Sequence, residues 1–403
     1  MLKLRIIGLI IAFSLCSLIH TACENRPQAK EVSPIKSALS TDYLLKGKWV
    51  KLDSPTHKNL YGVDFLDAEH GWVVGEDGTI LNTQDGGKTW KFAVSGSDAI
   101  LRDVDFIDAE HGWVVGDNGL EGGKGGKTVP KGEPTHYVRK PGHSISPPST
   151  ILHTDDGGKT WHFQSTPTNF ILRHIQMIDH KIGYIVSGVG HEHADGDIIY
   201  TDTGGANWRL GSWPKEHAKY CARNAYRTLW NVFFIDRKIG WVVGSSVLLD
   251  FESAKENSKK LNMPIMESDK GNILQTKDGG ETWTAQMADT KGFLTGVFFV
   301  NESTGWVIGE GGGIFHTTDD GKHWNEQNNP ISNDLTAIKF INPVCGWAVG
   351  KTGTVLFTTD GGEKWLSQPC SSNEDLNGMV ITANGACYIV GNKGVILKYC
   401  IND

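Results

Sequence analysis

Four arginines and three aromatic residues are the side chains best suited to recognising a charged partner. An arginine presents a flat, permanently charged fork that fits a carboxylate or a phosphate, and an aromatic ring offers a surface for stacking. In this sequence of 403 residues they lie near one long loop or at matching points of neighbouring repeats. We therefore predict a site for a protein partner or a small acidic ligand at Arg102, Arg173, Arg223, Arg227, Trp213, Tyr226 and Trp230.

An alternative role for these arginines is purely local. Each could form a solvated ion pair with a nearby acid such as Asp103 or Glu216. Exposed pairs of this kind contribute little free energy. The arrangement of the arginines in space decides between the two hypotheses.

The run HEHADGD at residues 191–197 is the second group that could do chemistry. Imidazoles and carboxylates are ligands for divalent cations, and side chains two residues apart share one face of an extended strand. The same composition is typical of a polar loop tip, which is the interpretation we favour. We therefore expect no cofactor, and name the ligands that a metal would use as His191, His193, Asp195 and Asp197.

The first 22 residues have the pattern of an export signal. Lys3 and Arg5 precede an uncharged apolar stretch at residues 6–18, which is too short to span a bilayer comfortably. A small residue directly before Cys23 resembles a bacterial lipobox, so we expect Cys23 to be acylated, with simple secretion as the alternative. Residues 23–45 then form a flexible tether, and the protein faces the periplasm or another extracytoplasmic space.

Five cysteines remain after the signal and Cys23. Export permits disulfides, but an odd number leaves at least one thiol unpaired within the chain. A bond between Cys370 and Cys400 near the chain end is one candidate pairing. The spacing contains no C-x-x-C pair of the kind that binds zinc.

A repeat of about 41 residues must position all of these groups. Its marker is a glycine–aromatic doublet, and the undisturbed spacing between doublets is 41 residues. A period near 40 with several short, β-branched strands per unit indicates a β-propeller. The seven aromatic positions are Trp72, Trp113, Tyr184, Trp241, Trp306, Trp347 and Tyr388.

Each repeat reads as four strands, and six of the seven carry a T-x-D-x-G-x-T-W box or a looser copy of it between the third and the fourth. Asp85 and Gly87 are in the first copy. The Asp side chain can accept backbone N–H bonds and the Gly supplies a positive φ, so we expect a structural turn. The last repeat lacks its fourth strand, and we expect residues 48–52 to supply it, with Trp49 in the box position. The fold is then an all-β, seven-bladed propeller over residues 46–403, closed by pairing its two ends.

The boxes and the G-W-x-V-G strands resemble the BNR-repeat propellers. More narrowly, they resemble the photosystem II stability/assembly factor family of plastids and cyanobacteria, over residues 46–403. That resemblance implies an exported, non-catalytic propeller that assembles or stabilises a membrane complex through a protein partner. The long insertions of this chain depart from the compact blades of that family.

Four insertions fall on one face of blades 2 to 4, at residues 118–150, 188–197, 211–228 and 246–271. Binding commonly resides on loops carried by a rigid scaffold. Within the last insertion, residues 250–263 could form a short amphipathic helix that packs on the scaffold. Seven residues at the second position of the first strands, here called the mouth residues, should line the channel mouth: Tyr61, Arg102, Arg173, Trp230, Thr295, Thr336 and Asn377.

An enzyme is the alternative function. Sialidases carry similar boxes, and their catalytic roles could fall to Arg102, Arg173, Arg227, Tyr226, Glu216 and Glu192. A propeller that binds glycans without catalysis is a further alternative. The Arg-Ile-Pro signature of that family is missing, so we favour a non-catalytic scaffold. The net charge of −7 at pH 7 argues against a nucleic-acid partner.

Overall fold

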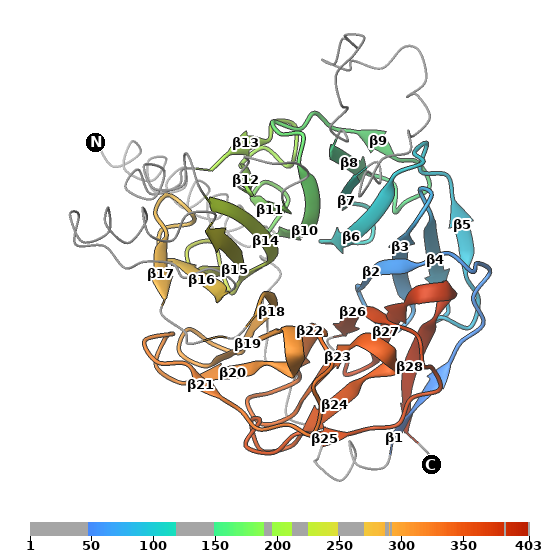
Figure 1. The fold of residues 1–403 in the computed structure, drawn as a ribbon. Helices are drawn as coiled ribbons and strands as arrows, with labels where there is room; N and C mark the ends of the chain where they lie inside the picture. Colours follow the sequence, from blue (N-terminus) through green and yellow to red (C-terminus); the bar gives the residue numbers. More distant parts are fainter. Residues whose placement is uncertain are drawn as a thin grey trace, which may run out of the picture.

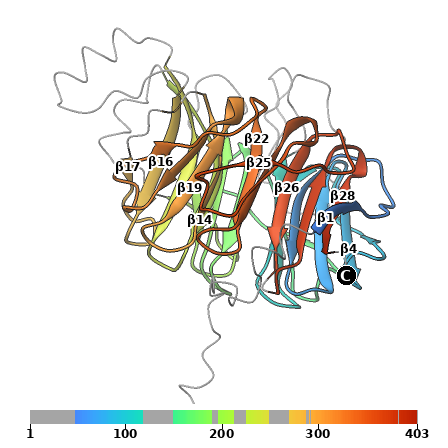
Figure 2. The same cartoon turned by 90° about the horizontal axis from the view of Figure 1, so that it is seen from below.

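The computed structural model describes residues 47–117, 149–188, 196–211, 225–248, 270–286, 290, 292–382 and 384–401, without the side chains of residues 225–227, 246–248, 270 and 401. The described strands form seven antiparallel sheets of four strands each. Figure 1 shows these sheets arranged as blades around a central channel, and Figure 2 shows them side-on. The predicted seven-bladed propeller is confirmed.

Within each blade the strands are given in order from the channel outwards. Blade 1 comprises β2 (Leu60–Phe65), β3 (His70–Gly75), β4 (Ile80–Gln84) and β5 (Lys91–Ala93). Blade 2 comprises β6 (Ile100–Phe106), β7 (Gly112–Asp117), β8 (Ser149–Thr154) and β9 (His162–Phe163). Blade 3 comprises β10 (Ile171–Met177), β11 (Gly183–Gly188), β12 (Ile198–Thr201) and β13 (Arg209–Leu210). Blade 4 comprises β14 (Ala225–Phe234), β15 (Gly240–Leu248), β16 (Lys270–Thr276) and β17 (Thr284–Gln286).

The remaining blades follow the same order. Blade 5 comprises β18 (Leu294–Phe299), β19 (Gly305–Gly309), β20 (Ile314–Thr317) and β21 (Asn325–Glu326). Blade 6 comprises β22 (Leu335–Phe340), β23 (Gly346–Gly350), β24 (Val355–Thr358) and β25 (Leu366–Ser367). Blade 7 comprises β26 (Leu376–Ile381), β27 (Cys387–Gly391), β28 (Ile396–Ile401) and β1 (Gly47–Lys51). Three 3₁₀ turns lie at Glu310–Gly312, Lys351–Gly353 and Asn392–Gly394.

The glycine–aromatic doublet builds the contact between neighbouring blades. The Trp72 ring stacks on Phe106 of the next blade with 3.6 Å between ring centres, and Tyr388 stacks on Phe65 across the closure at 3.8 Å. Six of the seven aromatics follow a glycine, whereas Tyr388 follows Cys387. In blade 1 packing favours this glycine, because a Cβ on Gly71 would lie 2.5 Å from the Phe65 ring. Stacked, fully buried aromatics of this kind supply much of the apolar contact that holds a propeller together.

The box turns have the self-contained geometry that the sequence predicts. In the first copy, Asp85 Oδ1 accepts the backbone N–H of Thr89 at 2.9 Å, and Oδ2 accepts the Thr89 hydroxyl at 2.6 Å. The Thr83 hydroxyl accepts the N–H of Gly87 at 2.9 Å, and Gly87 has a φ of 81°. The Asp side chains therefore hold turns.

The two ends of the chain close the ring. β1 pairs with β28 in antiparallel register, with Trp49 opposite Tyr399. The Trp49 indole N–H donates to Gln368 of blade 6 at 2.9 Å, as the box tryptophan Trp208 donates to Gln164 of the preceding blade at 2.9 Å. Trp49 thus occupies the box position of blade 7, as predicted.

Blade 4 differs from the sequence prediction at its upper end. We expected residues 211–228 and 246–271 to be loops, but β14 already begins at Ala225 and β15 runs to Leu248. Ala225 pairs with Leu248, so the hairpin continues beyond the other blades. Tyr226, Thr228 and Val247 in these extensions are residue types that favour strands. The expected helix at 250–263 and most of the four insertions lie outside the described residues.

The candidate disulfide is not formed. The thiol of Cys370 instead donates to the carbonyls of Gly353 and Ser372, at 3.3 and 3.2 Å, and Cys400 lies in β28 opposite Lys48. The two residues are therefore held on separate elements. In the described part of the chain, no helix is both long and apolar enough to cross a membrane.

Candidate functional site

A central cavity of about 1040 Å³ runs between the innermost strands of the seven blades. It is lined by residues of the first strand of every blade, so its wall is set by the rigid scaffold (Figure 1). A concave site carried by fixed strands suits recognition of a ligand or a peptide segment. All seven mouth residues line it, as they occupy the same position of each first strand.

Three mouth residues fasten the scaffold. Each donates a side-chain hydrogen bond to the backbone carbonyl of the leucine that begins the first strand of the next blade. The pairs are Thr295 with Leu335 at 2.6 Å, Thr336 with Leu376 at 2.6 Å, and Asn377 with Leu60 at 2.8 Å. At these three mouth positions a polar side-chain group is therefore engaged in the contact between blades.

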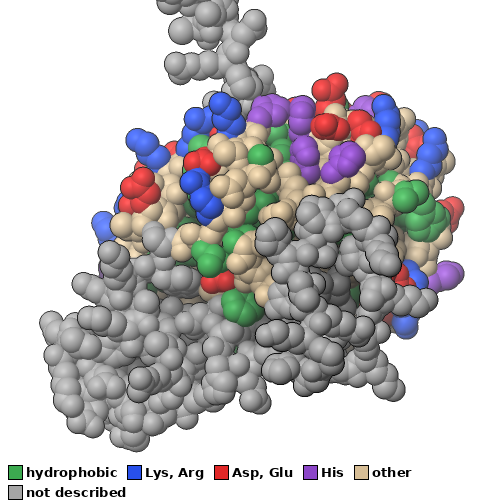
Figure 3. All heavy atoms as spheres, turned by 90° about the horizontal axis from the view of Figure 1, so that it is seen from above, with side chains coloured by type: hydrophobic (Ala, Val, Ile, Leu, Met, Phe, Trp, Pro, Cys, Tyr) green, Lys and Arg blue, Asp and Glu red, His purple; other side chains and the backbone are tan. Residues whose placement is uncertain are grey.

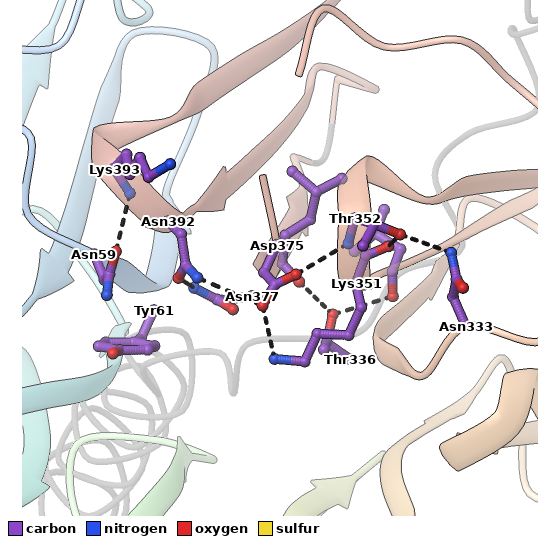
Figure 4. A network of polar contacts seen from close by, with 12 residues as sticks. Asn59, Tyr61, Asn333, Thr336, Lys351, Thr352, Asp375, Asn377, Asn392 and Lys393 are labelled. Atoms are coloured by element: carbon purple, nitrogen blue, oxygen red, sulfur yellow. Dashed lines mark hydrogen bonds and ion pairs between the residues drawn. The ribbon is translucent and has the colours of Figure 1, made fainter. Parts of the chain in front are cut away.

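A polar network extends this fastened sector between blades 6, 7 and 1 (Figure 4). The Lys351 ammonium donates to Asp375 at 3.1 Å, and the Thr352 backbone N–H donates to the same carboxylate at 3.0 Å. The backbone N–H of Lys393 donates to Asn59 at 3.0 Å. The pKa of Asp375 is lowered: burial acts to raise it, but these two donors outweigh that effect. The sector is thus satisfied internally.

Blades 3 and 4 carry a different arrangement at the mouth. The guanidinium carbon of Arg173 lies 3.8 Å from the centre of the Trp230 ring. The other side of Arg173 faces the end of β11, where a Cβ on Gly188 would come within 2.3 Å of Arg173 Nε. Arg173 therefore lies against the ring in a space that only a glycine leaves open, which pre-positions a cation at the mouth.

Arg102 of blade 2 has a structural partner. Its Nε donates to the carboxylate of Asp117, which is fully buried at the end of β7. The guanidinium carbon also lies 6.0 Å from the centre of the Tyr61 ring. Local ion pairing, the alternative that we considered for the arginines, therefore applies to Arg102, although the partner is Asp117 and not Asp103. A buried carboxylate needs such a partner.

Asp103 and His174 lie one residue deeper in the cavity. Asp103 Oδ2 accepts the backbone N–H of Ile175 at 2.9 Å and lies 3.6 Å from His174 Nε2. Burial raises the pKa of Asp103 to about 7 and lowers the pKa of His174 to about 3. Sequence reasoning missed this pair, although both residues directly follow a mouth arginine.

Two further acids of the cavity wall, Asp64 and Asp105, hold neighbouring blades together. Asp64 Oδ2 accepts the backbone N–H of Phe106 at 2.8 Å, and Asp105 Oδ2 accepts that of Met177 at 2.6 Å. Gln176 makes the equivalent link to Phe234, accepting its N–H at 2.7 Å. One residue of each of these first strands thus binds the backbone of the next strand around the channel.

Several predicted site residues cannot be placed in this geometry. Trp213, Arg223, Cys23, His191, His193 and Asp195 lie outside the described residues, as do the side chains of Tyr226 and Arg227. Asp197 is described, and its backbone N–H donates to the Ser187 hydroxyl at 2.7 Å. Of the predicted group, the structure brings together Arg173 and Trp230 and turns Arg102 towards Asp117.

The family model for the photosynthesis system II assembly factor YCF48 matches residues 42–99 and 265–329. The chain is 50% identical over 44 residues to the chloroplastic photosystem II stability/assembly factor of Guillardia theta, covering 10% of this chain and 11% of that protein. It is 37% identical over 60 residues to the photosystem II assembly protein Ycf48 of Thermosynechococcus vestitus, covering 15% of this chain and 17% of the relative. The matches thus span only a small share of these relatives.

Solved structures extend the similarity of fold over nearly the whole chain. A structure of YCF48 bound to D1 peptide superposes with a TM-score of 0.59 at 21% identity, covering 89% of this chain and 96% of the other. YCF48 from Cyanidioschyzon merolae gives 0.62 at 19% identity, covering 87% and 98%. The family match, the local identity and the propeller fold confirm the resemblance seen in the repeats: this chain is similar to the photosystem II assembly factor-like family of Asp-box propellers.

Proposed function

We propose that this protein is a non-catalytic scaffold that binds a segment of a protein partner at the channel mouth, on the side of blades 2 to 4. The partner belongs to a membrane or envelope complex whose assembly or stability the propeller supports. Arg173 is the primary contact and takes an acidic group of the partner, while Trp230 provides the stacking surface.

The single observation that carries this proposal is the asymmetry of the mouth. The mouth residues of blades 5 to 7 form hydrogen bonds to the backbone of the next blade. The mouth residues of blades 3 and 4, Arg173 and Trp230, are instead large side chains that contact one another. The pair crosses the interface of blades 3 and 4 and lies in the cavity wall, where it places a cation and an aromatic ring beside the channel. Arg and Trp are the residue types that most often dominate binding interfaces.

The similar proteins support a binding function. YCF48, which shares the fold, has been solved with a D1 peptide, and the curated relatives are named as photosystem II assembly or stability factors. For this chain we transfer the general role, the binding of a protein segment by a propeller. The resemblance to a lipobox at Cys23 supports a membrane-attached location for it.

Three acids of the cavity wall are bonded within the scaffold, which argues against their use by a hydrolase. A glycosidase needs two carboxyl groups free to act on a substrate. Here Asp64, Asp103 and Asp105 each accept a backbone N–H from the next first strand, as parts of the scaffold. Arg102, one of the arginines that a sialidase would need, forms an ion pair with Asp117.

The test is an affinity capture from solubilised membranes with the purified protein as bait. We compare the wild type with an Arg173→Ala/Trp230→Ala variant. The matched control is Arg209→Ala, because Arg209 also lies over an aromatic ring, 5.6 Å from the centre of Tyr200, but on the outermost strand of blade 3. All three proteins are first shown to have the same thermal transition.

We expect a membrane protein that the wild type and the control capture and the double variant loses. Capture that survives in the double variant would overturn the assignment of the mouth. Hydrolysis of sialosides or other glycans by the wild type would instead support the glycan-active alternative.

A further inference from the structure

A cluster of histidines and an aspartate lies at the opposite end of the channel from the mouth, on the face that carries the box turns. Figure 3 looks onto the outer side of blades 2 and 3 and shows histidine side chains gathered beside acidic ones. Asp108 and His111 come from the turn between β6 and β7, and His180 comes from the equivalent turn between β10 and β11. One ligand atom from each of the three lies within 4.8 Å of the others.

The turn fixes the carboxylate of Asp108. Its Oδ1 accepts the backbone N–H groups of Glu110 and His111, at 2.8 and 2.7 Å. The turn is also tied to the neighbouring box, because the Gly157 N–H donates to the carbonyl of Glu110 at 2.9 Å. The orientation of this carboxylate is therefore set before any ligand binds.

Two imidazoles face the same carboxylate. His111 Nδ1 lies 2.9 Å from Asp108 Oδ1 and 3.0 Å from Oδ2. His180 Nε2 lies 3.4 Å from Oδ2, and the two rings are perpendicular with 5.0 Å between their centres. A tetrahedral ion bound at about 2.1 Å from its ligands separates them by about 3.4 Å. All three atoms lie within 4.8 Å of one another, so small shifts of the side chains would bring them to this spacing around one ion.

We propose that Asp108, His111 and His180 form a binding site for a divalent transition-metal ion such as Zn²⁺. Imidazole and carboxylate are the ligand types that such ions take in proteins, and three protein ligands leave a position for water or for a group of a partner. The bound ion links the turns of blades 2 and 3. The site uses none of the mouth residues and none of residues 191–197.

The repeat supplies two internal comparisons. The same turn recurs in blade 1, where His70 Nδ1 lies 2.9 Å from Asp67 Oδ2. The residue of blade 2 that corresponds to His180 of blade 3 is Ala109, so the junction of blades 1 and 2 lacks the second imidazole. Between blades 3 and 4 the corresponding position is Arg237, which forms an ion pair with Asp179 at 2.6 Å. Only the junction of blades 2 and 3 combines the carboxylate with two imidazoles among the described turns.

The test measures binding of Zn²⁺ by calorimetry, and of Co²⁺ by visible absorption, to the full protein purified without a polyhistidine tag. We compare the wild type with His180→Ala, which reproduces the alanine found at the junction of blades 1 and 2 and should fold normally. The matched control is His70→Ala. A His191→Ala/His193→Ala variant separates any ion held by residues 191–197.

We expect one ion per chain whose affinity falls at least about tenfold in His180→Ala and is unchanged in His70→Ala and in the double loop variant. Ala109→His should add a second equivalent, because it completes the blade 1 turn with the same set of ligands. No binding by the wild type, or binding unchanged in His180→Ala, would overturn the proposal. A failure of Ala109→His to add a site would overturn the claim that the turn geometry makes the site.

Discussion

The guanidinium carbon of Arg173 lies over the Trp230 ring, 3.8 Å from its centre, and the two residues belong to the first strands of neighbouring blades. A cation held between a glycine and an aromatic ring needs little reorganisation on binding. This pair is the part of the mouth that we propose receives an acidic group of the partner.

Gly188→Ala tests that preparation without touching a contact residue. The added Cβ would lie 2.3 Å from Arg173 Nε and 2.9 Å from Thr228 Cγ2, so the guanidinium must leave the Trp230 ring. A cation–π contact contributes about 0.5–2 kcal/mol, so we expect partner capture to weaken about 2- to 30-fold in a dose–response pull-down. Gly313→Ala, where the Cβ meets nothing closer than 3.3 Å, is the control. Equal capture by both variants would contradict the prediction.

Trp49→Ala tests the closure of the ring. Trp49 is 3% exposed, packs against Tyr399 with 5.1 Å between ring centres, and bonds to Gln368. Loss of a buried tryptophan costs about 3–5 kcal/mol, so we expect the free energy of unfolding in urea to fall by that amount. Trp230→Ala should cost clearly less, because Trp230 faces the cavity. A cost below about 1 kcal/mol for Trp49→Ala would mean that β1 does not close the ring in solution.

The box turns should make the fold sensitive to acid. Hydrogen bonds from Thr89 hold the pKa of Asp85 at about 2, and those from His323 do the same for Asp319. Because these folded-state values lie below the ordinary value near 4, their stabilisation is present above about pH 4 and is lost as the pH falls towards 2. Asp85→Asn/Asp319→Asn should flatten the decline of Tm between pH 4 and 2. An unchanged slope would show that other carboxyl groups cause it.

Gly71→Ala tests why the doublet begins with glycine. Its Cβ would lie 2.5 Å from the Phe65 ring, and overpacking of a core costs about 1–3 kcal/mol. Gly311 has a φ of 62°, and a Cβ added there would meet no atom within 4 Å. Gly311→Ala therefore measures backbone strain without a packing clash. We expect the larger loss of unfolding free energy in Gly71→Ala. A larger loss in Gly311→Ala would show that the Phe65 ring gives way easily and that ring packing is not the reason for the glycine at position 71.

The sequence predicts the mouth positions but not what each arginine does there. A fixed period places Tyr61, Arg102, Arg173 and Trp230 at one level of the channel, because equivalent strand positions repeat around a ring. The partners Asp117 and Trp230 depend on side-chain direction and on local space. The role of Gly188 in making that space is visible only from the distance to Arg173 Nε.

By itself the sequence determined the propeller, its seven blades, the structural box turns and the closing role of Trp49. These features depend on strand alternation and on motifs that act within one repeat or between adjacent repeats. Only the tertiary structure decided that His180 meets Asp108, although each belongs to a different turn. The physical reason is that contacts between blades join residues about 40 to 70 positions apart, and no local pattern encodes which side chains meet across that interface.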